Sequence, residues 1–115
     1  MKPHVLHSLE KPDLFEKFKI QLNRDFELCG FLEYAPQIQS NDLNHICDEV
    51  LKSITQLERK NSGGLMNLLY RIDLTELQIK QAIKKEPKKA MQHIMAELII
   101  KRILQKVILK QMYSK

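Results

Sequence analysis

The segment of residues 88–115 contains neither Gly nor Pro, and this constrains the fold strongly. Breaks inside a helix usually have one of these two residues as their cause, so the segment predicts one long helix. Its apolar residues nevertheless move from one side of this helix to the opposite side along its length. At about 100° per residue, Ile94 lies on the flank opposite Ile103 and Val107. Such a helix needs packing partners on two sides.

The second apolar flank predicts a contact with another molecule. Five large aliphatic side chains left in water would forgo about 1.5–3 kcal/mol for each side chain that could be buried. We therefore expect this flank to pack against a second copy of the chain, most simply in a two-fold homodimer. The predicted self-association residues are Ile100, Ile103, Leu104, Val107 and Ile108. The alternative is a monomer in which other helices cover the last helix on both sides.

Apolar residues recur at spacings of three or four along the rest of the chain, which is typical of helices. With three Gly and four Pro in 115 residues, few positions interrupt this pattern. We expect an all-α fold, a small bundle of about five helices in a single domain over residues 1–115, with residues 1–11 as a flexible arm. The helices are expected over 12–28, from a cap at Ser40 or Asn41 to the sequence RKNSGG, over 65–72, from Asp73 to about residue 83, and from Pro87 to about Tyr113.

The start of the fourth predicted helix rests on a capping pattern. Asp73 is followed three residues later by Glu76, which is the spacing of a capping box. The helix that follows would bury Leu74, Leu77 and Ile83 on one face.

Positive charge is concentrated at the C-terminal end. The whole chain has a net charge of +5, yet residues 84–115 hold nine Lys and Arg against two Glu, a net charge of +7. The predicted basic patch consists of Lys84, Lys85, Lys88, Lys89, Lys101, Arg102, Lys106 and Lys110. Such a patch could neutralise phosphates of a nucleic acid, or it could be a solvated helix face. The basic, amphipathic stretch IIKRILQKVILK could also lie on an anionic membrane surface.

The residues that commonly carry chemistry form no recognisable motif. His45 and Cys47 are two positions apart, so on a helix they point about 200° away from each other and are poorly placed to bind one ion. His4 and His7 fall in the expected arm and have no second pair at a familiar ligand spacing. We predict no catalytic residue, no metal site and no cofactor, and two reduced cysteines. Charges interrupt every apolar run before the roughly 18 to 20 residues of a membrane span, so we expect a cytoplasmic protein.

Two sequence stretches, LLYRIDLTE and AELIIKRILQK, together resemble a pattern in short, uncharacterised bacterial all-helical proteins. The resemblance covers roughly residues 65 to 106 and implies a helical fold and a bacterial, cytoplasmic origin. It implies no activity. Within it, Tyr70, Arg71 and Asp73 predict a charge-assisted cluster that fixes the angle between two helices, with a docking site for a ligand as the less favoured alternative.

These observations favour a non-enzymatic function. We expect a structural or protein-interaction domain that self-associates through its C-terminal helix and whose other protein partner is unknown. The alternative is a nucleic-acid-binding protein that uses the basic segment 84–115.

Overall fold

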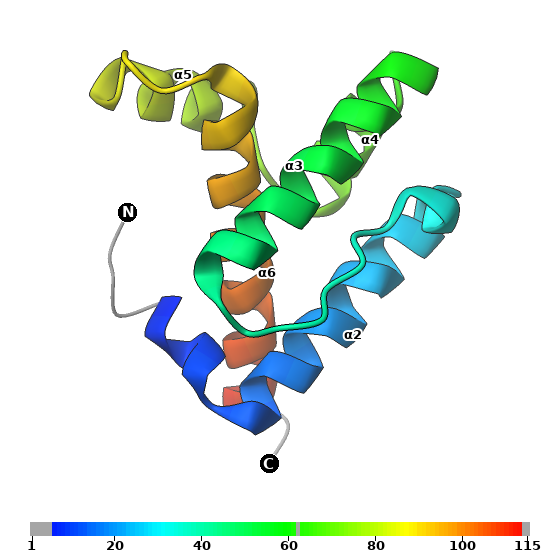
Figure 1. Cartoon of the computed structure of the whole chain (residues 1–115), viewed down its shortest axis with the longest axis vertical. Coiled ribbons are helices and arrows are strands. Elements are labelled where there is room, and N and C mark those ends of the chain that lie inside the picture. Colours follow the sequence, from blue (N-terminus) through cyan, green and yellow to red (C-terminus); the bar gives the residue numbers. More distant parts are fainter. Residues whose placement is uncertain (1–5, 62, 114–115) are drawn as a thin grey trace.

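The computed structural model describes residues 6–61 and 63–113, and every regular element in these ranges is helical. The elements are η1 (His7–Glu10), α2 (Pro12–Leu28), η2 (Leu32–Tyr34), α3 (Leu43–Lys60), α4 (Gly64–Arg71), α5 (Glu76–Lys85) and α6 (Met91–Tyr113). The five α-helices, of which the last is the longest, confirm the predicted all-α bundle. Figure 1 shows α6 running through the molecule, with α5 on one side of its first half and α2 and α3 on the other side.

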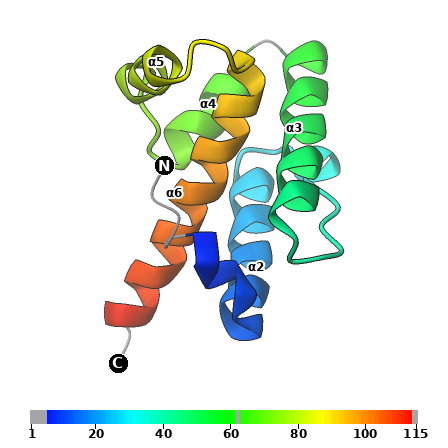
Figure 2. The same cartoon turned by 60° about the vertical axis from the view of Figure 1, so that its left-hand side comes forward.

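Helix α6 is buried on opposite flanks, and the flanks are covered by different helices. Ile94 and Ile103 are nine residues apart, so they point in opposite directions at about 100° per residue, and both are buried. Ile94 and Leu98 line a cleft that they share with Gln78 and Ala82 of α5. Helices α2 and α3 pack against α6 from the other side, as both cartoon views show (Figures 1 and 2). One chain therefore supplies both packing partners that the sequence of α6 requires.

The prediction that these five residues of α6 form a self-association surface is wrong. Ile100, Ile103 and Leu104 are fully buried in the core of a single chain, Val107 is 4% exposed and Ile108 is half-buried. The physical reason is the position of α5, which covers the first apolar flank of α6 and leaves the second flank free to pack on α2 and α3. Because its apolar side chains are used in the core, this stretch has no free apolar face to lay on a membrane. Among the described residues, no helix combines the length and the apolar character needed to cross a membrane.

The N-terminal segment is partly built into the core. The expected flexible arm covered residues 1–11, of which 1–5 lie outside the described residues. Leu9 in η1 is buried, Leu6 packs against the core, and the Asn41 side chain donates a hydrogen bond to the Leu9 carbonyl oxygen at 3.3 Å. For residues 6–11 the prediction of a loosely held arm is therefore wrong, because Leu6 and Leu9 bury apolar surface there.

The starts of α3, α5 and α6 differ from the expected ones. Helix α3 is capped by Asp42, whose carboxylate accepts from the His45 amide at 3.2 Å. The expected cap was Ser40 or Asn41. Helix α5 begins with a complete capping box of Thr75 and Gln78 instead of the expected Asp and Glu pair two residues earlier. Helix α6 begins at Met91 rather than at Pro87.

The capping difference changes which face of α5 is buried. In the structure Ile79 packs in the core, and Leu77 is exposed, contrary to the expected core face. The reason is that the backbone stays non-helical through Leu74 and Thr75, so the helical phase starts later than the sequence pattern suggests.

A single charge placed in the second flank of α6 tests this packing. Ile103→Lys puts an ammonium group at a fully buried position, so we expect the chain to unfold or to lose at least about 3 kcal/mol of unfolding free energy. Leu109→Lys, on an exposed position of the same helix, is the matched control and should remain within about 0.5 kcal/mol of the parent. Far-UV circular dichroism with urea titration measures both. A folded, monomeric Ile103→Lys protein would contradict the described core.

Candidate functional site

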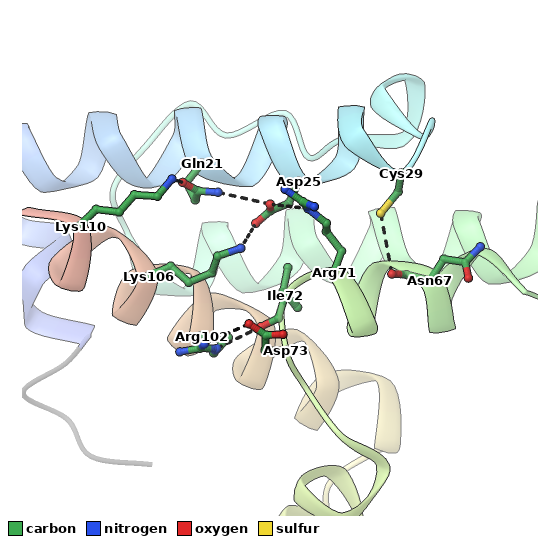
Figure 3. Close-up of polar contacts among 10 residues, drawn as sticks. All are labelled: Gln21, Asp25, Cys29, Asn67, Arg71, Ile72, Asp73, Arg102, Lys106 and Lys110. Atoms are coloured by element: carbon green, nitrogen blue, oxygen red, sulfur yellow. Dashed lines mark hydrogen bonds and ion pairs between the residues drawn. The ribbon is translucent and has the colours of Figure 1, made fainter.

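A buried carboxylate joins three helices. Asp25 of α2 is fully buried, and Lys106 Nζ of α6 donates to its Oδ2 at 3.0 Å. Arg71 Nε, from the last turn of α4, lies 3.6 Å from Asp25 Oδ1, to which Gln21 Nε2 donates at 3.3 Å. Lys110 Nζ in turn donates to Gln21 Oε1 at 2.7 Å. Figure 3 shows these five side chains as one connected group, which we call the Asp25 network.

The Asp25 network fixes how α2 and α6 are aligned. Removing an ionised carboxylate from water costs several kcal/mol unless cations and hydrogen-bond donors compensate it. Lys106 is the more enclosed of the two cations, with 18% of its side chain exposed against 47% for Arg71. One turn further along α6, Lys110 contacts Gln21, which lies one turn back along α2. The two helices are therefore held antiparallel, with Lys106 beside Asp25 and Lys110 beside Gln21.

The residues of the predicted helix junction do not form one cluster. Arg71 points to Asp25 on α2, whereas Asp73 lies 3.4 Å from the Arg102 guanidinium on α6, and Tyr70 is exposed. The expected joint cluster is wrong because Arg71 and Asp73 leave the end of α4 in different directions (Figure 3). Each of the two charged residues still ties this end of α4 to a different helix.

Asp73 also ends α4. Its backbone φ is 63°, in the left-handed region that Gly usually occupies after a helix. The Leu74 amide donates to the Leu69 carbonyl oxygen at 2.9 Å and the Asp73 amide to that of Tyr70 at 3.1 Å, which closes the last turn. Arg102 Nε donates to the adjacent Ile72 carbonyl oxygen at 3.1 Å. This terminus is thus tied to α6 through backbone and side chain.

The eight residues of the predicted basic patch are not one patch. On α6, Arg102, Lys106 and Lys110 point towards the rest of the molecule and contact Asp73, Asp25 and Gln21. Lys101 is half-buried and lines the cleft between α5 and α6, together with Lys85. Besides Lys110, the exposed members are at the end of α5 and in the turn after it: Lys84, Lys85, Lys88 and Lys89.

Lys89 forms a small ionic cluster at that turn. Its Nζ lies 2.7 Å from Glu86 Oε2 and 2.9 Å from Glu97 Oε1. The hydrogen bonds that Lys89 donates to Glu86 and to Glu97 raise the pKa of Lys89, and the contact with Lys89 lowers the pKa of Glu86. His93 Nε2 lies 3.6 Å from Glu97 Oε1. The positive charge of Lys89 is therefore largely compensated within the chain.

The cysteines and histidines show no shared site in the described part of the chain. Burial raises the pKa of the Cys47 thiol to about 11, so this group is protonated at neutral pH. Burial is also the main cause that raises the pKa of Cys29. His45 Nε2 accepts from the Gln39 amide at 3.1 Å, and His7 is exposed. No group of three or more His, Cys, Asp or Glu that could hold a metal ion occurs among the described residues, while His4 lies outside them.

A groove between α2 and α6 lies beside the Asp25 network. Its volume is about 250 Å³, and we call it the α2–α6 groove. Its lining combines three basic, two apolar and two amide side chains: Lys17, Arg24, Lys110, Ile20, Val107, Gln21 and Gln111. Ile20 is 64% exposed, which is high for an aliphatic side chain of this size. Sequence reasoning missed this groove because its two walls are more than eighty residues apart, and the outward position of Ile20 in α2 was the available signal.

A second groove lies on the other side of Ile20. It separates α2 from the connector after η2, has a volume of about 470 Å³ and is also lined by Glu16, Lys19 and Leu32. Lys19 pairs with Glu16 at 3.0 Å and lies over the ring of Phe15. Its charges are therefore balanced locally, unlike those of the α2–α6 groove.

Comparison of the chain with family models, with curated proteins and with solved structures finds no match. The resemblance of residues 65 to 106 to short bacterial helical proteins stays a prediction.

A double-mutant cycle measures the coupling between Asp25 and Lys106. Lys106→Met leaves a buried carboxylate with the more exposed Arg71, so we expect a loss of about 3–5 kcal/mol of unfolding free energy. Combining it with Asp25→Leu removes both charges, and the double variant should recover at least about 1.5 kcal/mol relative to the sum of the single losses. Urea unfolding followed by circular dichroism gives each value.

The matched control is an ion pair on the surface of α3. Lys52 and Glu49 are 3.0 Å apart, and the Lys52 side chain is 71% exposed. The same cycle on this pair should give a coupling of about 0.5 kcal/mol or less. Equal coupling energies for the two pairs would show that the Asp25 network does not hold the helices together.

Proposed function

We propose that this protein is a non-enzymatic interaction domain that binds a partner protein through the α2–α6 groove. The observation that carries the proposal is a surface concavity that combines a strongly exposed aliphatic residue, Ile20, with three cationic side chains. Apolar contacts surrounded by charged groups are typical of protein–protein interfaces. The most enclosed ionisable groups, Asp25 and Cys47, support a non-enzymatic function, since one is occupied by structural contacts and the other is a protonated thiol.

A partner of different sequence fits the groove better than a second copy does. In a two-fold interface the same patch lies on both sides, so this basic groove would face the basic groove of the copy. Like charges brought together across an interface oppose association. The homodimer stays a prediction without an assigned surface, because most of the residues first expected to form it are in the core.

Site-specific photo-crosslinking tests the proposed function. A photo-reactive phenylalanine derivative at Ile20 should give a discrete crosslinked product in cells that naturally produce the protein. The same derivative at Gln56, on the exposed face of α3, is the matched control and should give none. Crosslinking from Gln56 but not from Ile20 would contradict the groove as the contact surface.

Nucleic-acid binding is the second candidate. It is favoured by one observation, the exposure of Lys84, Lys85 and Lys88 with no ion pair to another described residue. Three free cations could neutralise about three phosphates, which predicts weak and salt-dependent binding.

Fluorescence anisotropy with a labelled duplex measures the second candidate. Binding that disappears in a Lys84→Glu, Lys85→Glu, Lys88→Glu variant and weakens steeply with salt would support it. The absence of binding at low salt would remove it.

A further inference from the structure

The geometry of the groove points to the kind of partner that it takes. We propose that the α2–α6 groove binds an acidic amphipathic helix of the partner protein, with an apolar side chain on Ile20, next to Val107, and carboxylates at Lys17, Arg24 and Lys110. This inference rests on the proposed function and specifies the chemistry of the partner.

The groove as a whole has room for one large side chain. Ile20 and Val107 come from different helices and line the same concavity of about 250 Å³. A cavity of about 150 Å³ with aliphatic walls is large enough to bind benzene. A Leu or Phe side chain of a partner therefore fits between α2 and α6, and it would cover Ile20, which is now in contact with water.

The positive charges that line the α2–α6 groove are incompletely compensated within the chain. Lys17 is 3.4 Å from Asp13, but this pair is exposed and lies on a single helix, so it exchanges readily for a new partner. Lys110 donates to the neutral Gln21, which leaves its positive charge unbalanced. Arg24 has no ion-pair partner among residues 6–61 and 63–113. Three cations against one carboxylate favour an acidic partner.

The Asp25 network holds one of these cations in place before a partner arrives. Gln21 donates to the buried Asp25 through Nε2 and accepts from Lys110 through Oε1, so its amide orientation is fixed from both ends. Figure 3 shows Lys110 reaching Gln21 and, through it, Asp25, so these hydrogen bonds orient Lys110, which also lines the groove. A side chain that is ordered in advance loses less conformational entropy when it binds.

The spacing along α2 matches a helical partner. Lys17 and Arg24 are seven residues apart, about 10 Å along a helix, and Ile20 lies between them. A helix laid along this groove presents side chains at the same interval, two acidic residues seven positions apart with an apolar residue three or four positions after the first. Phosphates of a nucleic acid would satisfy the cations but not the apolar floor, and the lining contains no aromatic side chain on which a base could stack.

A designed peptide tests the inference on the intact chain. The probe is a fluorescein-labelled helical peptide with Glu at two positions seven apart and Leu between them. We expect saturable binding by anisotropy and ¹⁵N amide shift changes confined to residues 17–24 and 107–111. The peptide with Leu replaced by Ser and the peptide with Glu replaced by Lys should each bind about tenfold more weakly or not at all.

Charge reversal locates the site. Arg24→Glu with Lys110→Glu should weaken binding of the probe by about tenfold or more. Lys52→Glu with Lys80→Glu changes the net charge equally on exposed positions of α3 and α5, and it should change the affinity less than about twofold. Circular dichroism confirms that both variants are folded. Equal weakening by the two pairs, binding of the Ser peptide at full affinity, or tighter binding of a DNA duplex in the groove would overturn the inference.

The same charge-reversed variant separates this inference from the proposed function. If the crosslink at Ile20 persists in Arg24→Glu with Lys110→Glu, a partner uses the groove without the charge recognition proposed, and only the inference fails. If no crosslink forms at Ile20 in the parent protein, the proposed function fails.

Discussion

The buried carboxylate of Asp25 is the interaction on which the arrangement of the helices depends. It lies outside the reach of water, so it is tolerated only where Lys106 and Arg71 are brought to it. The contact with Lys106 spans 81 positions in the sequence and sets the alignment of α6 on α2. Apolar packing alone would permit several alignments of two long helices, whereas a buried charge permits only those that bring a cation to it.

The same network links stability to the surface proposed for binding. Gln21 connects the buried carboxylate of Asp25 to Lys110 at the α2–α6 groove. The Asp25 end of this series of hydrogen bonds is structural, and the Lys110 end faces solvent. A partner that engages Lys110 need not disturb Asp25, because Lys106 and Arg71 already compensate it. The groove can thus exchange water for a partner while the core keeps its contacts.

Counting charges along the sequence overestimated the basic surface. Three basic residues lie on adjacent turns of α6, yet each donates to an acceptor on another part of the chain: Arg102, Lys106 and Lys110. Long basic side chains can cover apolar surface and still reach a buried acceptor, so a row of them is a poor guide to free charge. Conversely, Lys17 and Arg24 contribute to the groove although they belong to the part of the sequence that carries a net negative charge.

The sequence by itself determined the helices, since spacings of three and four are a local property, and it showed that α6 needs cover on two flanks. It could not determine what provides that cover. Whether Ile103 meets a second copy or its own chain depends on the path of α5, and that path depends on the turn closed by Asp73 and on the Thr75 cap. The Asp25 network and the α2–α6 groove combine residues from both ends of the chain, so only the tertiary structure decided them.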